Sequence, residues 1–266
     1  MTLAPEEIKS CCATAYSSPT ARWLLGDSFH PGGAALTTRL ARALQVGPGK
    51  LVVDVASGPG TSALQLAHET GCDVVGVDLA SDSVAAAARA AAEAGVSDRV
   101  RFIHGDAEAL PLADEAVDGV LCECALCTFP DKAMAARQFA RVLRPGARVA
   151  ISDITACRDE LPPALLSMQA WIACIADARP LDEMASLLED GGLVVETTER
   201  HDDALGAMLD RIDARLKAAR LLGAGLYGDG VRRGRELVGA ARDALAADHL
   251  GYAVVVARRP GRVPLG

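Results

Sequence analysis

Apolar runs and helix-like patterns alternate through the middle of the chain. Between residues 51 and 95 the order is an apolar run, a glycine turn, a helical pattern, a second apolar run that ends at Asp78, and an alanine-rich helical pattern. Short apolar runs bounded by turn residues predict buried strands, and strands that alternate with helices predict a parallel sheet. Later strands are predicted at 99–104, 117–123 and 148–153, with a helix at 131–143. The pattern therefore predicts a parallel, doubly wound α/β sheet with right-handed crossovers.

Helical patterns also lie on both sides of this central stretch. Leu36, Leu40 and Leu44 recur on one face of a predicted helix at 34–44, between the glycine- and proline-rich breaks. Leu205, Leu209 and Leu216 recur at helical spacing near the C-terminus, which predicts an amphipathic helix over the body of the domain. The remaining elements are helices at 165–176 and 181–189, a sixth strand at 193–199, a second amphipathic helix, and a seventh strand at 249–258.

Composition and charge narrow the class of partner. The formal net charge is −8 at pH 7, whereas a nucleic-acid surface needs a basic stripe that neutralises phosphates. No apolar stretch reaches the roughly 18 residues of a membrane span, and no basic, then apolar leader opens the chain. We expect a cytoplasmic protein that acts on a small molecule and contacts neither nucleic acid nor membrane. Its eight cysteines are then expected as reduced thiols.

A glycine turn in the segment "VVDVASGPGTSA" carries the first chemical signal. Gly58 and Gly60 follow a strand and open a helix, where backbone N–H groups approach a ligand closely because no Cβ intervenes. Asp78 ends the next strand, where a carboxylate can accept the hydroxyl groups of a ribose. Ala63 completes a G-x-G-x-x-A pattern that nicotinamide dehydrogenases also tolerate. Against a dehydrogenase, about fifty residues precede the glycine strand and no catalytic set for hydride transfer follows it.

From residue 51 to residue 154 the chain resembles the class I S-adenosylmethionine-dependent methyltransferases. The segments "VVDVASGPG", "VVGVDLA", "GDAEALPLADEAVDGVLC" and "RVLRPGARVAISD" stand in that family's order and spacing. The resemblance implies that S-adenosylmethionine is the cofactor. It also implies a single domain over 1–266: a helical cap at 1–48, a cofactor-binding core at 49–160, and acceptor-side helices with the final strands at 161–266. The expected fold is a seven-stranded Rossmann-like sheet with N-terminal helices and a helical insertion before the last strand.

The resemblance also assigns roles to individual residues. Asp54, Gly58 and Gly60 would frame the methionine part of the cofactor, and Asp78 would bind the ribose. Asp106 and Ala107 would lie at the adenine edge. Leu79, beside Asp78, and Glu123, at the end of the fourth strand, complete the expected cofactor-binding set.

Cysteines crowd the end of the fourth strand in "VLCECALCTF". Strand alternation places Cys122 and Cys124 on one face, and a small buried cysteine is the simplest interpretation of Cys122. Cys124 and Cys127 form one C-x-x-C pair, but no second pair follows at the spacing of a zinc site. No resident metal is therefore expected. A third interpretation is a site for a soft element, which thiolates select.

For the third interpretation, the segments that carry the cysteines resemble those of the arsenite methyltransferases. In "ECALCTFPDK" Cys124 keeps that family's distance from Lys132, "WIACIADARPLDEMASLLEDGGL" offers Cys174, and "SCCATAY" offers Cys11 or Cys12. The segments differ from that family at Glu123 and in "IADA". The leading hypothesis is that Cys124 and Cys174, with Cys11 or Cys12, hold arsenic(III), whose lone pair attacks the methyl group. A thiol reductant would restore the thiols.

Two alternatives stay open. One is methyl transfer to O, N or C of a small organic metabolite, with Glu123, Asp153 or His30 as a base. The other is a non-catalytic metalloid-binding protein on the same scaffold, which the intact glycine turn and Asp78 argue against. In both enzyme hypotheses the helices at the two ends shape the acceptor pocket and exclude water.

Overall fold

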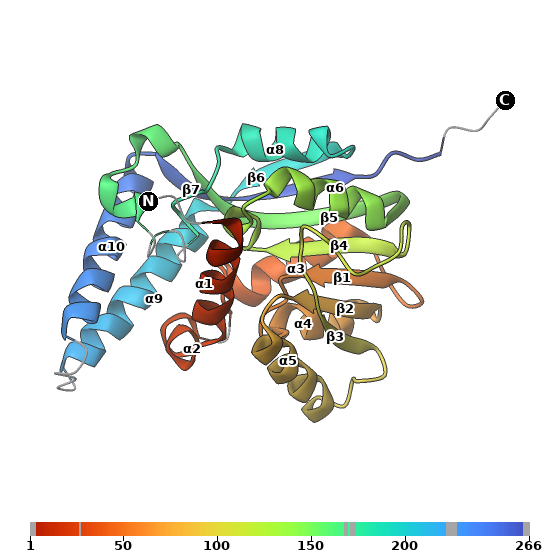
Figure 1. The fold of residues 1–266 in the computed structure, drawn as a ribbon, viewed down its shortest axis with the longest axis horizontal. Helices are drawn as coiled ribbons and strands as arrows, with labels where there is room; N and C mark the ends of the chain where they lie inside the picture. The colour runs from red at the N-terminus through yellow and green to blue at the C-terminus, as the bar shows by residue number, and fades with distance from the viewer. Residues whose placement is uncertain (1–3, 27, 168–169, 171–173, 222–227, 263–266) are drawn as a thin grey trace.

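A computed structural model gives the structure of residues 4–26, 28–167, 170, 174–221 and 228–262. Its seven strands form one sheet in the order β3-β2-β1-β4-β5-β7-β6, flanked by helices on both faces (Figure 1). The prediction of a seven-stranded, doubly wound fold is confirmed. The strands are β1 (Leu51–Val55), β2 (Asp73–Asp78), β3 (Val100–His104), β4 (Val117–Glu123), β5 (Leu143–Ala156), β6 (Val194–Arg200) and β7 (Leu250–Arg258).

The sheet is mixed rather than wholly parallel. Strands β3, β2, β1, β4 and β5 pair in parallel, whereas β7 runs antiparallel to both β5 and β6. The parallel pairing predicted from the first five strands is confirmed. The direction of β7 was not predicted, because two helices before β7 do not fix the direction in which the chain returns. The parallel part brings the carboxyl ends of β1, β2 and β4 to one edge, so their terminal carboxylates become neighbours.

Two hydrophobic cores lie on the two faces of the sheet. One face is covered by α3 (Gly33–Leu44), α4 (Thr61–Thr70), α5 (Ser81–Glu93), α9 (Asp202–Leu221) and α10 (Gly228–Ala246), and the other by α6 (Lys132–Val142) and α8 (Leu181–Asp190). Alternation along β1 explains the division: Val52 belongs to the same core as Leu40 of α3, whereas Val53 belongs to the same core as Phe139 of α6. Cys122 is fully buried in the second core, which accounts for its presence by packing.

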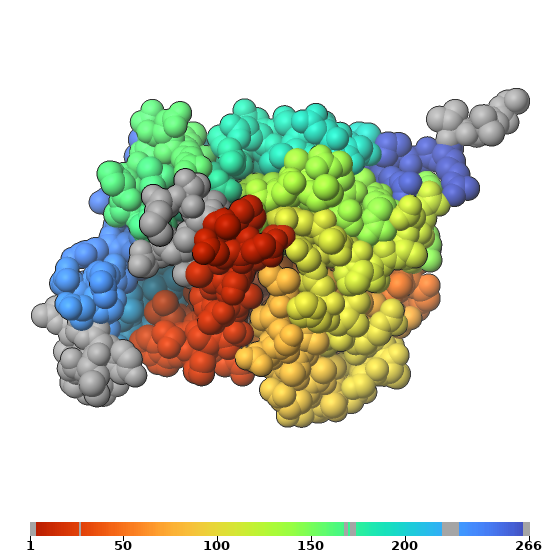
Figure 2. All heavy atoms as spheres, viewed as in Figure 1, coloured from red at the N-terminus to blue at the C-terminus, as the bar shows by residue number. Residues whose placement is uncertain are grey.

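The N-terminal helices α1 (Pro5–Ser17) and α2 (Pro19–Leu25) lie outside the sheet. Helix α1 contacts the short 3₁₀ turn η1 (Leu126–Thr128) that follows β4, and α2 contacts α9. The space-filling view shows both helices lying across one face of the molecule, between α10 and α5 (Figure 2). The cap expected from the sequence therefore lies near the carboxyl edge of the sheet.

One predicted helix differs from the structure at both of its ends, although Ala170 within it is helical. The expected helix at 165–176 falls partly outside the described residues. Inside them, the 3₁₀ turn η3 (Pro163–Leu166) replaces its start, and Cys174 has a left-handed φ of 64° at its end. Leu165 and Cys174, near these two ends, are both buried in the core. No helix in the described parts of the chain has the length and apolar character of a membrane span.

Candidate active site

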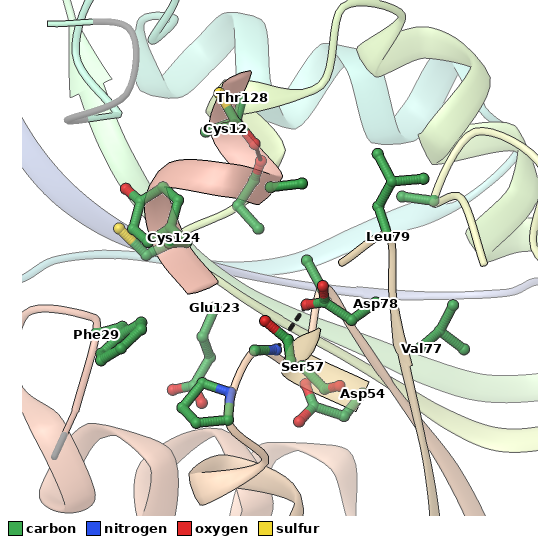
Figure 3. A pocket seen from close by; sticks show the side chains of 18 of the residues that line it. Cys12, Phe29, Asp54, Ser57, Val77, Asp78, Leu79, Glu123, Cys124 and Thr128 are labelled. Atoms are coloured by element: carbon green, nitrogen blue, oxygen red, sulfur yellow. Dashed lines mark hydrogen bonds between the residues drawn. The ribbon is translucent and has the colours of Figure 1, made fainter. Parts of the chain in front are cut away.

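A cavity of about 150 Å³ lies at the carboxyl edge of the sheet, beneath α1. Of the residues assigned to the cofactor, seven line it: Asp54, Gly58, Asp78, Leu79, Asp106, Ala107 and Glu123. Figure 3 shows Asp54, Asp78 and Glu123 on one side of the cavity, with Cys12 and Thr128 across from them. Gly60 is not in the wall. The fold thus gathers residues that are up to 69 positions apart in the sequence (from Asp54 to Glu123) around one space.

The two glycines of the turn have different surroundings. Gly58 has φ 51°, and a Cβ placed on it would meet no atom within 4 Å, because it faces the cavity. Gly60 has φ 84° and caps α4, and its Cβ would lie 2.6 Å from Phe102 Cζ and 2.9 Å from Ala87 Cβ. Gly60 is therefore required for packing of the turn, whereas Gly58 leaves open space for a ligand.

Asp78 is held in place by the turn. Its Oδ2 accepts a hydrogen bond of 2.7 Å from the Gly58 N–H, and its Oδ1 accepts one of 2.8 Å from the Ala80 N–H. Burial raises the pKa of Asp78 above its usual value, although these hydrogen bonds oppose the shift. Carboxylate oxygens have further lone pairs, so Asp78 can still accept hydrogen bonds from the hydroxyl groups of a bound sugar.

Asp54 is buried, and its Oδ2 has no hydrogen-bond partner among the described residues. The Ser57 hydroxyl oxygen, also buried, has none there either. Burial raises the pKa of Asp54 well above its usual value, and the nearby carboxylates of Glu123 and Asp78 raise it further. Buried polar atoms without partners are costly, so this end of the cavity is suited to a ligand that brings donors and positive charge. The sulfonium and ammonium groups of S-adenosylmethionine fit that requirement.

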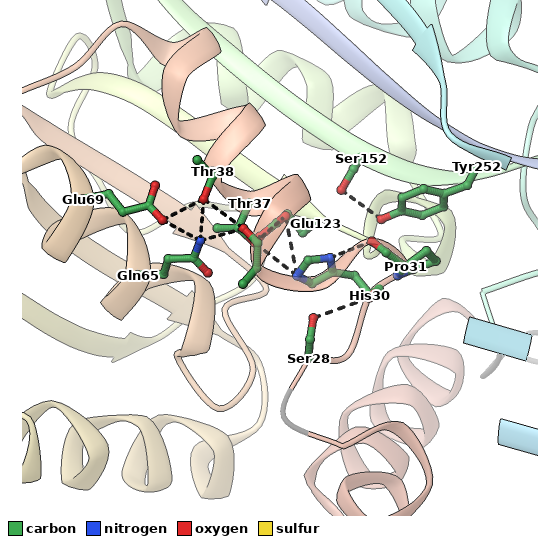
Figure 4. Close-up of polar contacts among 11 residues, drawn as sticks. Ser28, His30, Pro31, Thr37, Thr38, Gln65, Glu69, Glu123, Ser152 and Tyr252 are labelled. Carbon is green, nitrogen blue, oxygen red and sulfur yellow. Dashed lines mark hydrogen bonds and ion pairs between the residues drawn. The ribbon is translucent and has the colours of Figure 1, made fainter. Parts of the chain in front are cut away.

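Glu123 belongs to a buried polar network with α3 (Figure 4). Its two carboxylate oxygens lie 3.1 and 3.2 Å from the Thr37 hydroxyl, which donates to them. His30 Nδ1 donates to the Pro31 carbonyl at 3.0 Å, and its Nε2 lies 3.3 Å from Thr37 Oγ1 and 3.6 Å from Glu123 Oε1. Both ring nitrogens of His30 are thus engaged, and the network fixes the Glu123 carboxylate at the cavity wall. Thr37 was not predicted, because its sequence context is an ordinary helical one.

Lys9 of α1 was also not predicted. Its Nζ lies 2.7 Å from Asp106 Oδ2 and 2.6 Å from Glu108 Oε2. Burial lowers the pKa of Lys9, but the hydrogen bonds to these two carboxylates outweigh it and raise the pKa above its usual value. The pair of bonds ties α1 to the adenine end of the predicted cofactor site. No motif around Lys9 indicates this contact.

The cysteines divide into those at the cavity and those away from it. Cys12 and Cys124 line the cavity, whereas Cys11 is exposed on the outside of α1. Cys174 lies beside Cys124: its Sγ is 3.4 Å from the Cys124 carbonyl oxygen, and its thiol hydrogen-bonds with those of Cys124 and Cys127. Cys124 and Cys174, fifty positions apart, are therefore brought together. Among the described residues no group of three His, Cys, Asp or Glu side chains is arranged to hold a metal ion.

A second cavity of about 340 Å³ adjoins the first. Tyr16, Phe29 and Cys124 line both. The rest of the second wall is almost entirely apolar. It comes mainly from α2, α9 and α10, with Ile154 of β5, Cys174 and Ile175. The apolar members include Leu24, Leu25, Ile154, Ile175, Leu205, Met208, Leu209, Ile212, Leu216, Leu237 and Val238. No described residue of this wall is an aspartate, glutamate, lysine, arginine or histidine. The sequence predicted helices here but not the size of the space between them.

Residues 53–151 match the family model described as a methyltransferase domain. The chain is 28% identical to methyltransferase GfsG of Streptomyces halstedii over 88% of this chain and 83% of that protein. It is 33% identical to the arsenite methyltransferase of Halobacterium salinarum, over 54% of this chain but only 37% of the length of that relative. The stretch that matches the family model includes the glycine turn and Asp54, Asp78, Asp106 and Glu123, which line the first cavity.

A solved structure of similar fold is a Haemonchus contortus phosphoethanolamine N-methyltransferase, in complex with phosphomonomethylethanolamine and S-adenosylhomocysteine. It superposes with a TM-score of 0.81 at 18% identity, over 97% of this chain and 61% of that one. The similarity extends from the sheet to the flanking helices, so it supports the arrangement of strands and cap described above.

Proposed function

We propose that this chain, which is an S-adenosylmethionine-dependent methyltransferase, transfers the methyl group to an oxygen atom of an uncharged, largely apolar small molecule. The observation that carries the proposal is the second cavity, of about 340 Å³, which opens beside the cofactor cavity. A wall of aliphatic side chains favours an apolar ligand, and a few convergent polar groups orient it. Here those groups are Tyr16, Cys124 and Cys174 at the end that meets the cofactor cavity.

The described part of this wall has no carboxylate and no basic side chain, which narrows the class of acceptor. An amine is cationic at neutral pH and would need a buried carboxylate to compensate its desolvation, and a carboxylate acceptor would need a cation. The described wall offers neither. A hydroxyl group is neutral and needs only hydrogen-bond partners, so an alcohol or a phenol fits best.

The cofactor supplies an electrophilic methyl group on a sulfonium. The chain must hold donor and acceptor in line, about 3 Å apart, and keep water out. Asp78 and the glycine turn would position the cofactor, Asp54 and Glu123 would face its positive charges, and α1, α2, α9 and α10 would enclose the acceptor.

The test is methyl transfer from deuterium-labelled S-adenosylmethionine, followed by mass spectrometry of the products. The acceptors are 1-naphthol and 4-nonylphenol as neutral apolar phenols, with tyramine and 4-hydroxybenzoate as charged phenols of smaller apolar area. We expect labelled product from the neutral pair and at least about tenfold less from the charged pair, which corresponds to 1.4 kcal/mol of discrimination. Equal methylation of all four, or of the charged phenols alone, would contradict the proposal.

Arsenic(III) is a second candidate acceptor, favoured by one observation. Cys124 and Cys174 lie in contact beside the first cavity, with Cys12 in its wall. Thiolates select soft elements of this kind, and an arsenite methyltransferase is among the relatives. The same labelled cofactor with arsenite and excess thiol, which would act as the reductant, tests it. Methylarsenic that is absent in Cys124→Ser would favour this candidate over the organic acceptor.

A further inference from the structure

Tyr16 stands at the junction of the two cavities. Among the described residues only Tyr16, Phe29 and Cys124 line both, and of these only Tyr16 and Cys124 carry an ionisable group. The Tyr16 hydroxyl lies 3.0 Å from Cys174 Sγ. A hydroxyl at this junction is placed where a donor in the first cavity and an acceptor in the second would meet.

The backbone is strained at the two cysteines beside Tyr16. Cys124 has φ 52° and Cys174 has φ 64°, both in the left-handed region. A residue with a Cβ is strained in this region, and such strain clusters at functional sites. Both residues are held there by surrounding structure: the Cys124 N–H donates to the Ser152 carbonyl, and Cys174 is 2% exposed.

Cys174 collects hydrogen bonds from three side chains. The thiols of Cys124 and Cys127 hydrogen-bond with it and lower its pKa well below the usual value. The Tyr16 hydroxyl and the charge of Lys132 act in the same direction, while burial opposes them. Burial and the same contacts raise the pKa values of Tyr16 and Cys127, and the hydrogen bond with Cys174 is the main cause at Cys124. Asp153 and Cys12 are the other ionisable neighbours. Cys174 is therefore the member of the cluster whose pKa is lowered, and its sulfur lies 3.0 Å from the Tyr16 hydroxyl.

The other bases near the junction are engaged elsewhere. His30 uses both ring nitrogens within its own network, and Glu123 accepts from Thr37. Asp153 accepts the N–H groups of Cys127 and Ile154 and does not reach either cavity wall. Tyr16 lines both cavities, and its hydroxyl contacts the Cys174 sulfur, which can accept a proton from it.

We propose that Tyr16 is the catalytic residue that takes the proton of the acceptor hydroxyl, and that Cys174 is the positioning residue that receives the Tyr16 proton in turn. This inference rests on the proposed function. The acceptor oxygen uses a lone pair to bond the methyl carbon as the carbon–sulfur bond breaks, and that electron pair stays on the sulfur of S-adenosylhomocysteine. The acceptor proton passes to the Tyr16 oxygen while the Tyr16 proton passes to the Cys174 thiolate. After the product leaves, water takes the proton from the Cys174 thiol.

The first test counts thiolates by ultraviolet absorbance as pH is raised from about 5 to 9. Wild type and the control Cys157→Ser, whose residue is exposed in a loop, should show one thiolate that persists toward low pH. Cys174→Ser should lack it. A titration that is the same in wild type and Cys174→Ser would overturn the inference whether or not any acceptor is methylated.

The second test is the pH dependence of 1-naphthol methylation. Tyr16→Phe should lower the rate at least about 100-fold, the lower range for a general base, with S-adenosylmethionine binding unchanged. Cys174→Ser should move the rising limb of the profile to higher pH, which a merely structural role would not do. An unchanged profile in Cys174→Ser would overturn the inference and leave the proposed function intact. A low-pH thiolate without methylation of any acceptor would instead overturn the proposed function and the role of the base together.

Discussion

Gly58 and Gly60 provide a sharp test of the cofactor site because they lie two positions apart in one turn and differ in what surrounds them. A methyl group on Gly58 would enter open space that faces the first cavity, whereas a methyl group on Gly60 would lie 2.6 Å from Phe102 and 2.9 Å from Ala87. The changes Gly58→Ala and Gly60→Ala therefore place the same group on either side of the same turn. One intrudes on the ligand and the other on the protein core.

The magnitudes follow from these surroundings. Both glycines have positive φ, so alanine costs about 1–2 kcal/mol at either position. The lower conformational freedom of the unfolded variant offsets roughly 0.4–1 kcal/mol of that. Gly60→Ala adds overpacking of about 1–3 kcal/mol. We therefore expect a loss of about 1 kcal/mol in the free energy of unfolding for Gly58→Ala and about 2–4 kcal/mol for Gly60→Ala.

The assay pairs urea denaturation with calorimetric titration of S-adenosylmethionine. Gly58→Ala should weaken cofactor binding by at least about tenfold, or 1.4 kcal/mol, in a protein that remains folded. Gly60→Ala should show the larger loss of stability and the smaller loss of affinity in its folded fraction. Wild-type affinity in Gly58→Ala would refute the reasoning, because the space beside Gly58 would then not be the cofactor's.

Three further perturbations test the polar contacts around the site. Lys132→Met removes one of the three cationic partners of the buried Asp177 carboxylate, which keeps Arg158 and Arg179, so urea denaturation should show a loss of about 1–3 kcal/mol; an unchanged free energy of unfolding would contradict the contact. Lys9→Met should lower the free energy of unfolding by about 1–3 kcal/mol through its two carboxylate partners. The exposed control Lys217→Met should cost less than about 1 kcal/mol, and equal losses would refute the α1 anchor. Burial raises the pKa of Asp153 to about 7, so the native state binds a proton that the unfolded state releases near pH 4. Its contribution to stability is therefore present below that pH and is lost as pH rises toward 7, by up to about 1.4 kcal/mol per unit; Asp153→Asn should lack this component of the slope, and parallel curves for the two proteins would disprove it.

The positions of the strands along the chain and of the glycine turn could be predicted because they depend on local sequence. The apolar runs that end at Val55 and Asp78 and the glycine turn between them carry their own signals of strand, turn and ligand. The antiparallel direction of β7 depends instead on how α9 and α10 pack, which no local pattern encodes. For the same reason the 3₁₀ turn at Pro163–Leu166 was expected as a helix.

The acceptor side was predicted less completely because its contacts join distant segments. The proximity of Cys124 and Cys174 was suggested by a resemblance, but the contact of Tyr16 with Cys174 has no sequence signal: an exposed-looking helix must first dock on the sheet edge. Lys9, which anchors that helix, looks like any surface lysine in the sequence. The volume of the second cavity likewise depends on the spacing of α2, α9 and α10 rather than on which apolar residues they carry.

The most direct test of the central claim, that the apolar cavity binds the acceptor, is the effect of filling it. Leu209 of α9 lies in the cavity wall, whereas Ala214 is exposed on the same helix. The measurement is the KM for 1-naphthol in Leu209→Trp and in the matched control Ala214→Trp, with the Kd of S-adenosylmethionine determined in parallel. The account predicts a KM at least about tenfold higher in Leu209→Trp alone, with the cofactor Kd unchanged in both variants. An unchanged KM in folded Leu209→Trp would contradict it.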